Sequence, residues 1–556
     1  MLNKKKFFFM PLLCLLPLLG TAQTKDDVAG DRGFEIAKNL EIFANVYKNI
    51  NTYYVDDIEP GKTMKIAIDA MLANLDPYTN YFPESSIEDV KLQLMGEYGG
   101  VGALIHQKGD SIYVAEPYEG FPAQKAGIKA GDRYVSIDGE SVAGKKVGNI
   151  SEKLRGQAGT TVEVELERDG KTFTKTLKRE KVKFPAVPYY GIVKGSQIGY
   201  IKLNEFTQGA AVQVRQAFEK LKQDNPHLQG VILDLRGNGG GLMNEAVDLV
   251  NIFVKRGEMI VETKGKTASR NTKSYTTQQP ADLNIPLAVL VDGSSASSSE
   301  IVSGSLQDLD RAVVIGSRTL GKGLVQNVLP MEYNTQMKVT VSKYYIPSGR
   351  CVQAIDYAHR DENGRPLTVP DSLKTAFKTR NGRTVYDGFG IEPDVDIPME
   401  YMNMLEVTLM QKFLIFDYAT QYAAQHPTVP AAADFAITDE IYNDFKNFLA
   451  QQNYEYKTAT ERIIDEVRKM AKDECYLDSI NDELGVLEQQ LAIAKSHDLD
   501  QFRPQVSMLL KGEILSRYYY QKGRIEGSLA EDPCVTKAIA VLMDKDGYKD
   551  TLNIKK

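Results

Sequence analysis

A run of serines near the middle of the chain is the feature whose residue types are best suited to chemistry. The segment Asp292–Glu300 reads DGSSASSSE, and Lys322 follows it between two glycines. A serine hydroxyl needs a base to act as a nucleophile, but no histidine lies between residues 228 and 358. A lysine kept neutral by burial can replace histidine, which arginine cannot. The pattern indicates a hydrolase with a serine nucleophile and a lysine base; a polar Ser/Gly-rich loop with a surface lysine is the alternative.

The first residues predict export from the cytoplasm. Lys4–Lys6 form a positive segment, Phe7–Leu19 form a short apolar run, and Gly20–Ala22 supply small residues for cleavage. This arrangement is typical of a secretory signal peptide over residues 1–22, because the apolar run is too short to span a bilayer. An uncleaved membrane anchor is the alternative. We expect a periplasmic or otherwise extracytoplasmic protein after removal of the signal peptide.

Composition argues against several classes of protein. Removal of the three lysines of the signal peptide takes the formal net charge from −7 to about −10, and an acidic chain without a basic stripe argues against nucleic acid as a partner. No later stretch reaches about eighteen apolar residues, so we expect no membrane span in the mature chain. The spacing of the remaining cysteines fits neither a metal site nor a disulfide framework: Cys351, Cys475 and Cys534.

The chain after the signal peptide divides into four expected parts. The first is an N-terminal helical region, residues 23–95, in which apolar residues at helical spacing predict helices over 35–50 and 63–75. The second, residues 96–180, is a compact mixed unit with a short helix near 122–126 and a longer one near 147–155. Strand-like runs separated by turns predict its strands: 111–115, 133–137, 161–168 and 172–178.

The third part, residues 181–400, alternates apolar β-branched runs with helical stretches, which implies an α/β core whose central strands are covered on both faces. Its expected strands are 198–203, 230–235, 287–291 and 312–315, and its expected helices are 210–222, 244–253 and 299–307. The fourth part, residues 401–556, is a helical C-terminal domain. The fold class is therefore multidomain α+β, with an α/β core, an inserted mixed unit and helices at both ends, which are compatible with a homodimer.

Three motifs of the mixed unit occur in the order found in a PDZ domain. They are Gly99–Gly102 (GGVG), Pro122–Asp132 (PAQKAGIKAGD) and Ile137–Gly139 (IDG), so the unit from Glu97 to Arg179 resembles a PDZ domain. Backbone N–H groups exposed by the glycine turn can hold a carboxylate, and the following strand offers an edge to an extended peptide. The expected peptide-binding residues are Gly99, Gly100, Val101, Gly102, Ala103 and Leu104.

The segments around the serine run resemble the carboxyl-terminal processing proteases. The matching segments are Leu75–Thr79, Leu233–Gly241, Gly304–Asp308, Arg311-Ala312, Lys343–Arg350 and Gly390–Val395. The resemblance covers roughly residues 40 to 397 and implies a secreted or periplasmic serine endopeptidase that cuts protein substrates near their C-termini. It also implies that the partners are proteins or peptides with free C-termini, bound as an added strand by the PDZ domain.

The resemblance assigns roles to individual residues. When Ser299–Ile301 is aligned with the family's Ser-Glu-Ile, the nucleophile corresponds to Ser297. This residue lies twenty-five residues before Lys322, which is the family spacing. Residue type alone leaves the choice open, because serines here replace the family's usual glycine or alanine. Lys322 would be the general base. Gln326 resembles the family's third member, whose amide would orient the lysine; a purely structural amide is the alternative.

The resemblance also implies two backbone N–H groups that stabilise the oxyanion. One comes from the glycine turn and one from the residue after the nucleophile, here Gly240 and Ser298. The turn carries Gly237 and Gly239 where the family usually has asparagine and proline. The choice between Gly239 and Gly240 therefore stays open.

Several charged residues in turns could be taken for acid–base or metal residues. Single carboxylates after strands are more often caps or ion pairs, and we interpret these residues in that way: Asp76, Asp234, Arg236, Asp308 and Asp394. No cluster of His, Asp and Glu has metal-ligand spacing, so we expect no metal and no cofactor. Two alternatives to a protease remain, a catalytically silent PDZ peptide-binding scaffold and a hydrolase for a non-protein acyl substrate.

Overall fold

The structure is a computed structural model that describes residues 25–84, 97–452 and 454–554. The expected signal peptide, residues 1–22, lies outside the described residues. The chain divides into two units, Met1–Asn74 and Leu75–Lys556. No helix of the described residues is long and apolar enough to cross a membrane.

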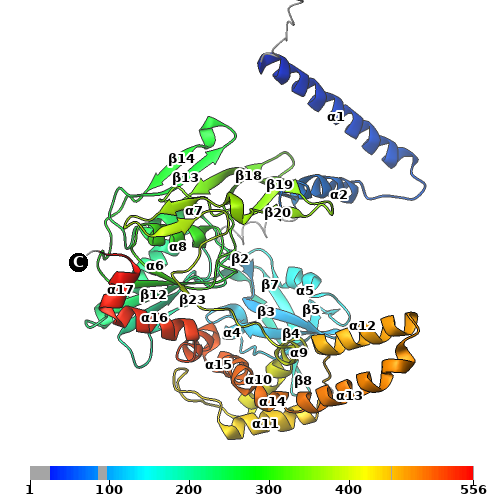
Figure 1. The fold of residues 1–556 in the computed structure, drawn as a ribbon. Coiled ribbons are helices and arrows are strands. Elements are labelled where there is room, and N and C mark those ends of the chain that lie inside the picture. The colour runs from blue at the N-terminus through cyan, green and yellow to red at the C-terminus, as the bar shows by residue number, and fades with distance from the viewer. Residues whose placement is uncertain (1–24, 85–96, 453, 555–556) are drawn as a thin grey trace, which may run out of the picture. The chain divides into compact units, whose positions relative to one another are not determined.

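The first unit contains the helices α1 (Lys25–Tyr53) and α2 (Pro60–Ala73) (Figure 1). Both begin earlier than predicted, and for α2 the reason is Pro60, whose fixed φ suits the first turn of a helix. The Tyr47 hydroxyl donates a hydrogen bond to the Pro60 carbonyl at 2.8 Å and so ties the two helices together. Within this unit, large apolar side chains of α1 such as Phe34 and Leu40 are exposed.

The second unit begins with β1 (Asn80–Phe82) and continues, after the undescribed residues, with a mixed module that has its own core. Its sheet has the order β3-β4-β5-β7-β8 with β6 beside β5, and β2 pairs with β9. Fully buried side chains such as Ile112, Val164 and Leu166 fill this core. The elements are β2 (Glu97–Gly100), β3 (Ala103–Lys108), β4 (Ser111–Pro117), α4 (Pro122–Lys125), β5 (Arg133–Ile137), β6 (Glu140–Ser141), α5 (Val147–Leu154), β7 (Thr161–Arg168), β8 (Lys171–Lys178) and β9 (Glu180–Lys183).

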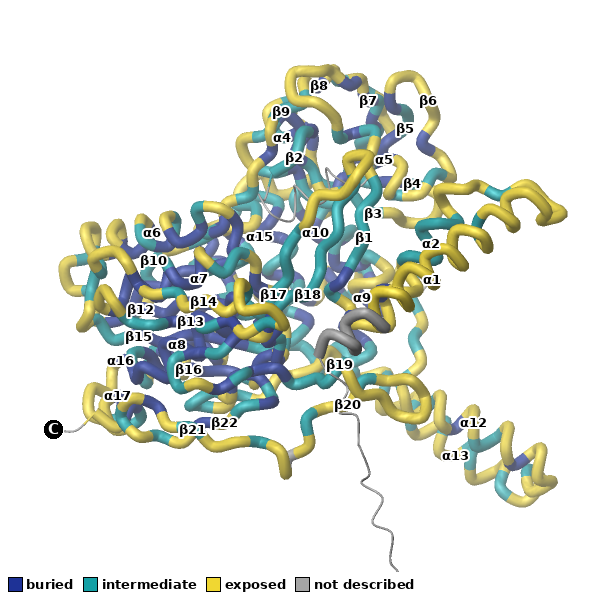
Figure 2. Tube along the Cα trace, turned by 90° about the horizontal axis from the view of Figure 1, so that it is seen from above, coloured by how far each residue is buried: buried dark blue, intermediate teal, exposed yellow. Residues whose placement is uncertain are grey.

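A six-stranded sheet of order β10-β11-β12-β15-β16-β23 forms the α/β core. β10 is antiparallel to β11, and the other neighbours are parallel. β12 and β15 are buried along their whole length, as Figure 2 shows, which explains the apolar runs Val231–Leu233 and Leu287–Val291. The strands are β10 (Tyr189–Ile192), β11 (Ile198–Lys202), β12 (Gly230–Asp234), β15 (Leu287–Val291), β16 (Val313–Gly316) and β23 (Val395–Asp396).

Helices cover both faces of this sheet. On one face lie α6 (Ala210–Asp224), α7 (Met243–Val250) and α8 (Ser298–Asp308), which share a hydrophobic core with Leu233. On the other face, α16 (Pro533–Met543) and α17 (Lys545–Thr551) share a core with Ile232. Neighbouring residues of β12 point to opposite faces, as the two-residue period of a strand requires. α16 and α17 fall within residues 401–556, which the sequence predicts as a separate helical domain, whereas in the structure they pack on the α/β core.

A second, antiparallel sheet has the order β1-β18-β13-β14, with β17 also paired to β18. Lys338 of β18 is opposite Asn80 of β1 and opposite Val328 of β17. No sequence pattern predicted this sheet. Its other strands are β13 (Met259–Gly265), β14 (Thr272–Tyr275), β17 (Leu324–Pro330) and β18 (Gln336–Tyr345).

The remaining elements are two short hairpins and a set of helices with a separate hydrophobic core. Three of these helices are preceded by the N-cap residues Asn403, Thr438 and Thr458, whose side chains accept a hydrogen bond from the first turn. The hairpin strands are β19 (Ile355–Arg360), β20 (Pro366–Thr368), β21 (Ala376–Lys378) and β22 (Thr384–Tyr386). The helices are α9 (Met404–Gln411), α10 (Leu414–Gln425), α11 (Asp439–Ala450), α12 (Ala459–Asp473), α13 (Leu477–Lys495), α14 (Asp498–Gln501) and α15 (Arg503–Ser528).

Candidate active site

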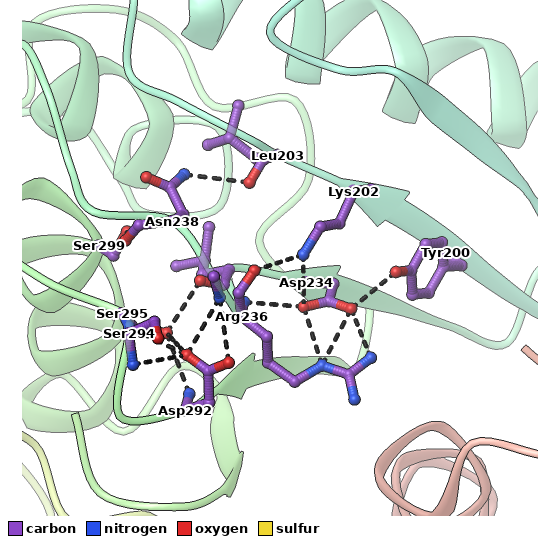
Figure 3. A network of polar contacts seen from close by, with 12 residues as sticks. Tyr200, Lys202, Leu203, Asp234, Arg236, Asn238, Asp292, Ser294, Ser295 and Ser299 are labelled. Carbon is purple, nitrogen blue, oxygen red and sulfur yellow. Dashed lines mark hydrogen bonds and ion pairs between the residues drawn. The ribbon is translucent and has the colours of Figure 1, made fainter. Parts of the chain in front are cut away.

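The serine run forms the turn between β15 and α8, at the carboxyl edge of the parallel sheet. The Asp292 carboxylate organises this turn by accepting hydrogen bonds from the N–H groups of Gly237, Ser294 and Ser295 (Figure 3). Gly237 belongs to the glycine turn after β12, so one carboxylate joins the two turns. Ligands of open α/β sheets bind outside the carboxyl ends of the strands, which makes this edge the candidate site.

The serines of the run use their hydroxyls differently. Three hydroxyls donate to backbone carbonyls: Ser295 to Leu235 at 2.9 Å, Ser298 to Gly241 at 2.9 Å and Ser299 to Asn238 at 2.8 Å. Ser294 is exposed on the surface. The hydroxyl of Ser297 donates to no acceptor in the described part of the chain, and Ser297 lines a cleft of about 430 Å³.

Ser297 also has an unusual backbone. Its φ of 56° and ψ of −113° fall outside the regions that non-glycine residues normally occupy. Such a conformation costs on the order of 1–3 kcal/mol and persists only where the surroundings hold it. A strained serine between a strand and a helix presents its hydroxyl at the top of the sheet, as in the nucleophile elbow of other hydrolases.

The cleft brings together all of the residues that the sequence analysis assigns to catalysis. Its lining includes Ser297, Ser298, Gly240, Lys322 and Gln326. They come from the start of α8 and the turn before it, the glycine turn after β12, and β17 with the loop that precedes it. Segments distant in sequence therefore meet in one cavity.

Lys322 lies in a tightly packed loop whose flanking glycines cannot be replaced without a clash. A Cβ on Gly321, which has φ +85°, would lie 2.4 Å from the Ala354 Cβ, and a Cβ on Gly323 would lie 2.8 Å from the Gln353 N. The Lys322 ammonium Nζ lies 4.3 Å from the centre of the Tyr78 ring. The loop therefore presents one lysine side chain against an aromatic face.

Burial lowers the pKa of Lys322 from 10.5 to about 8, and the positive charge of Lys338 adds to this lowering. The carboxylates of Glu300 and Asp76 act in the opposite direction but do not outweigh burial. A lysine in this setting is neutral in a substantial fraction of molecules near pH 8, which is the form that can accept a proton.

Gln326 lines the cleft, but its amide faces a neighbouring strand. Its Nε2 donates to the Thr340 hydroxyl on β18 at 3.1 Å. Within the described residues, no hydrogen bond joins Gln326 to Lys322. The Lys322 ammonium is a donor, so it would bond the Oε1 of Gln326, and the bond from Nε2 to Thr340 does not prevent this.

The two expected oxyanion donors differ in availability. The N–H of Ser298, at the start of α8, has no acceptor among the described residues, whereas the N–H of Gly240 donates to the Asn238 Oδ1 at 2.9 Å. A Cβ on Gly240 would lie 2.8 Å from the Ser297 Cβ, so glycine is needed for the close approach of the two turns. Gly239 also lines the cleft, and the choice between Gly239 and Gly240 stays open.

The expected peptide-binding residues lie at one edge of the mixed module. Gly99 and Gly100 belong to β2 and pair with β9, so the turn itself consists of Val101 and Gly102, whose φ is +71°. Ala103 and Leu104 open β3, which is the edge strand of its sheet, and the Leu104 side chain is exposed. An edge strand with a free side can accept an added strand.

The charged residues of turns form caps and ion pairs, as interpreted from the sequence. Asp234 binds Arg236, Lys202 and Tyr200 (Figure 3). Burial would raise the pKa of Asp234, but Arg236 and Lys202 outweigh burial and hold it below its usual range. The others are paired in the same way: Asp76 accepts from Tyr78 N and Thr79 N, Asp308 pairs with Arg350, and Asp394 pairs with Arg383. The described residues contain no group of three or more His, Cys, Asp or Glu that could hold a metal.

Sequence reasoning missed two residues beside Lys322. Tyr78 lies in the segment Leu75–Thr79, which was singled out only as a landmark, and no local signal shows that its ring meets the lysine. Lys338 lines the cleft from β18, and burial lowers its pKa. Nothing in the local sequence distinguishes it from a surface lysine.

Family models match three parts of the chain: "Peptidase family S41" over residues 197–358, a PDZ domain over 113–168, and "Probable PDZ-protease, C-terminal helical domain" over 405–542. A carboxy-terminal-processing protease of Bartonella bacilliformis is 34% identical over 361 residues, which cover 64% of this chain and 81% of that protein. A probable CtpA-like serine protease of Staphylococcus aureus (strain N315) is 34% identical over 317 residues, or 56% of this chain and 62% of that protein.

Among solved structures, a photosystem II D1 C-terminal processing protease is 27% identical and covers 64% of this chain and 92% of that chain, with a TM-score of 0.35. The family membership rests on the Bartonella relative, most of whose length is matched, and on the family models for the protease and PDZ parts. The family predicted from the sequence motifs is confirmed. The chain belongs to the carboxy-terminal-processing proteases, a family of serine proteases that carry a PDZ domain.

Proposed function

We propose that the chain is an endopeptidase that cuts protein substrates near their C-termini, with Ser297 as nucleophile and Lys322 as general base. One observation carries the choice of serine. The neighbouring buried serines donate their hydroxyls to backbone carbonyls, whereas Ser297 has a strained backbone and lines the same cleft as Lys322.

In this mechanism the neutral Lys322 amine takes the proton from the Ser297 hydroxyl, whose oxygen attacks the scissile carbonyl carbon. The resulting oxyanion would be stabilised by the N–H of Ser298 and by one N–H of the glycine turn, from Gly240 or Gly239. Such a donor is typically worth about 3–4 kcal/mol. The lysine ammonium then gives its proton to the leaving amine, and a water activated by the same lysine releases the acyl group. Gln326 would orient the ammonium by accepting a hydrogen bond at its Oε1 while its Nε2 donates to Thr340.

The PDZ module would bind the tail of the substrate. The short turn of Val101 and Gly102 followed by the free edge of β3 supports the capture of a terminal carboxylate and the addition of the tail as a strand. The basic, then apolar, N-terminal sequence supports export and an extracytoplasmic location. The exposed apolar side chains of α1 are compatible with a homodimer.

Incubation of the purified chain with an unfolded protein tests the proposal. Ser297→Ala and Lys322→Ala should each abolish cleavage and leave the fold intact. Ser294→Ala is the matched control, because Ser294 is exposed and outside the cleft lining. Retained cleavage by Ser297→Ala, with loss in Ser295→Ala or Ser298→Ala, would move the nucleophile to another serine. If the wild-type chain binds a C-terminal peptide but cleaves no protein, the alternative of a catalytically silent PDZ scaffold would be favoured.

A further inference from the structure

One buried carboxylate contacts the backbone of both Ser297 and Lys322. Glu300 is fully buried in the first turn of α8, and its Oε2 accepts hydrogen bonds from the N–H of Ser297 and the N–H of Lys322, each at 2.8 Å. Its Oε1 accepts from the N–H of Gly321 at 2.8 Å and from the Thr319 hydroxyl at 2.6 Å. A single side chain therefore connects the turn of the serine to the loop of the lysine.

One phenol contacts the carbonyls of the same two residues. The hydroxyl of Tyr344, on β18, lies 3.1 Å from the Ser297 carbonyl oxygen and 2.9 Å from the Lys322 carbonyl oxygen. Its side chain is 1% exposed. A phenol has one proton to donate, so the two carbonyls share it. Both N–H groups thus meet one carboxylate, and both carbonyls meet one hydroxyl.

The hydrogen bonds of Glu300 favour its ionised form. Three of the four groups that it contacts are backbone N–H donors, and an ionised carboxylate is an acceptor only. The fourth, the Thr319 hydroxyl, can donate as well as accept. Burial raises the pKa of Glu300 above its usual value, and the hydrogen bonds from Thr319, Lys322, Ser297 and Gly321 oppose that rise without cancelling it. The negative charge of its ionised form favours the ammonium form of Lys322.

We propose that Glu300 and Tyr344 are positioning residues that set the distance and orientation between the Ser297 hydroxyl and the Lys322 amine. The proposal rests on the catalytic roles proposed above for Ser297 and Lys322. The two reactive groups form no hydrogen bond to each other in the described structure, so their placement depends on their backbones. The strained backbone of Ser297 must itself be held by its surroundings, and Glu300 and Tyr344 bind both sides of it.

Because Glu300 can carry a negative charge, its substitution should change the pH dependence of activity, which the loss of an uncharged structural contact would not do. Among the charged groups around Lys322, Glu300 and Asp76 favour its ammonium form and Lys338 disfavours it. The Tyr78 ring also lies beside its ammonium. Glu300→Gln removes one negative charge, so it should lower the pKa of Lys322 and move the acid limb of activity to lower pH. Tyr344→Phe removes no charge, so the limb should stay in place.

The test measures kcat and KM of the full chain on an internally quenched peptide from pH 6 to 10. Glu300→Gln and Tyr344→Phe should each lower kcat about 100-fold, the usual loss for a small misplacement of reacting groups, with little change in KM. In Glu300→Gln the remaining activity should extend to lower pH than in the wild type.

Two matched controls remove buried groups of the same chemical types elsewhere. The Glu245 carboxylate accepts hydrogen bonds from the N–H groups of Gly209 and Ala211, and the Tyr548 hydroxyl bonds the backbone of Leu287, at the opposite end of β15 from the serine turn. Glu245→Gln and Tyr548→Phe should keep kcat and the acid limb near their wild-type values, even where they lower thermal stability.

The possible results separate the positioning role of Glu300 and Tyr344 from the catalytic role of Ser297. Wild-type kcat in folded Glu300→Gln and Tyr344→Phe overturns the positioning role, and so does a loss of kcat in Glu300→Gln without movement of the acid limb. Where Glu300→Gln does not fold, Tyr344→Phe against Tyr548→Phe decides by kcat alone. Cleavage by Ser297→Ala would instead overturn the proposed nucleophile, so failure of the two proposals can be told apart.

Discussion

Lowering the pH should inactivate the protease by protonating Lys322. Burial lowers the pKa of this lysine to about 8, with Lys338 as the next cause. A base with that pKa is about one tenth neutral at pH 7 and about nine tenths neutral at pH 9. The value of kcat/KM should therefore rise about tenfold between pH 7 and pH 9 and level off above pH 9.

A lysine with an ordinary pKa would give a different curve. At the reference value of about 10.4, the neutral fraction would rise nearly a hundredfold over the same interval and would still be rising steeply at pH 9. The position of the plateau therefore separates a buried lysine from an exposed one. Lys322→Arg is the matched variant, because a guanidinium stays charged at every accessible pH, and it should be inactive throughout.

The assay uses initial rates on a quenched peptide with a free C-terminus, with thermal unfolding followed at each pH so that a loss of fold is not counted as a loss of base. A flat profile from about pH 6 to 10 at constant stability would refute a lysine base. Activity in Lys322→Arg would do the same. A plateau reached only above about pH 10 would refute the argument from burial.

Two further experiments address the surroundings of the lysine and the tail-binding module. Lys338→Met removes a positive charge that lowers the pKa of Lys322, so the acid limb of the activity profile should move to higher pH. Lys343 is an exposed lysine on the same strand, so the control Lys343→Met should leave the acid limb in place. An unmoved acid limb in Lys338→Met would show that the two lysines do not interact. Amidation of a peptide's C-terminus should weaken its binding to the uncleaving Ser297→Ala chain about tenfold or more, roughly 1.4 kcal/mol by calorimetry, and equal affinities would mean that the module recognises internal segments.

The α/β core could be predicted because its central strands are buried on both faces. Most of β12 and all of β15 appear in the sequence as short apolar runs, which are typical of parallel strands in the middle of a sheet. α8 begins within one residue of its predicted start. The motifs of the PDZ module could be recognised because some of their glycines are required by the local backbone. Gly102, for example, has a positive φ, which favours glycine.

The antiparallel sheet beside the cleft could not be predicted in the same way. Most side chains of β17 and β18 are only partly buried, so their sequences mix polar and apolar residues without a clear period. The contact between Thr79 and Thr340 joins residues 261 positions apart, and no local pattern encodes such a pairing. The helical region gave no recognisable motif, although a family model matches residues 405–542, because helical periodicity alone is common to many folds.

The residues of the candidate site could also be predicted only in part. Residue types narrowed the nucleophile to a run of serines, and the resemblance selected Ser297. The backbone conformation of Ser297 and the hydrogen bonds of its neighbours depend on how the two turns pack, which the sequence does not state. The amide of Gln326 faces Thr340 because the adjacent strand supplies a hydroxyl there.

The packing of α16 and α17 on the core sheet bears on when the protease can mature. Val535, Ala538 and Leu542 cover the face of the sheet that contains Ile232 and Leu290, and they are made some 300 residues after β12. A nascent chain on the ribosome therefore exposes this apolar face until α16 has emerged, and the hydrophobic effect cannot close the core before then. A truncation before Pro533 would remove part of the core rather than an appendage. Competence to cut thus depends on the polypeptide having been synthesised through these helices.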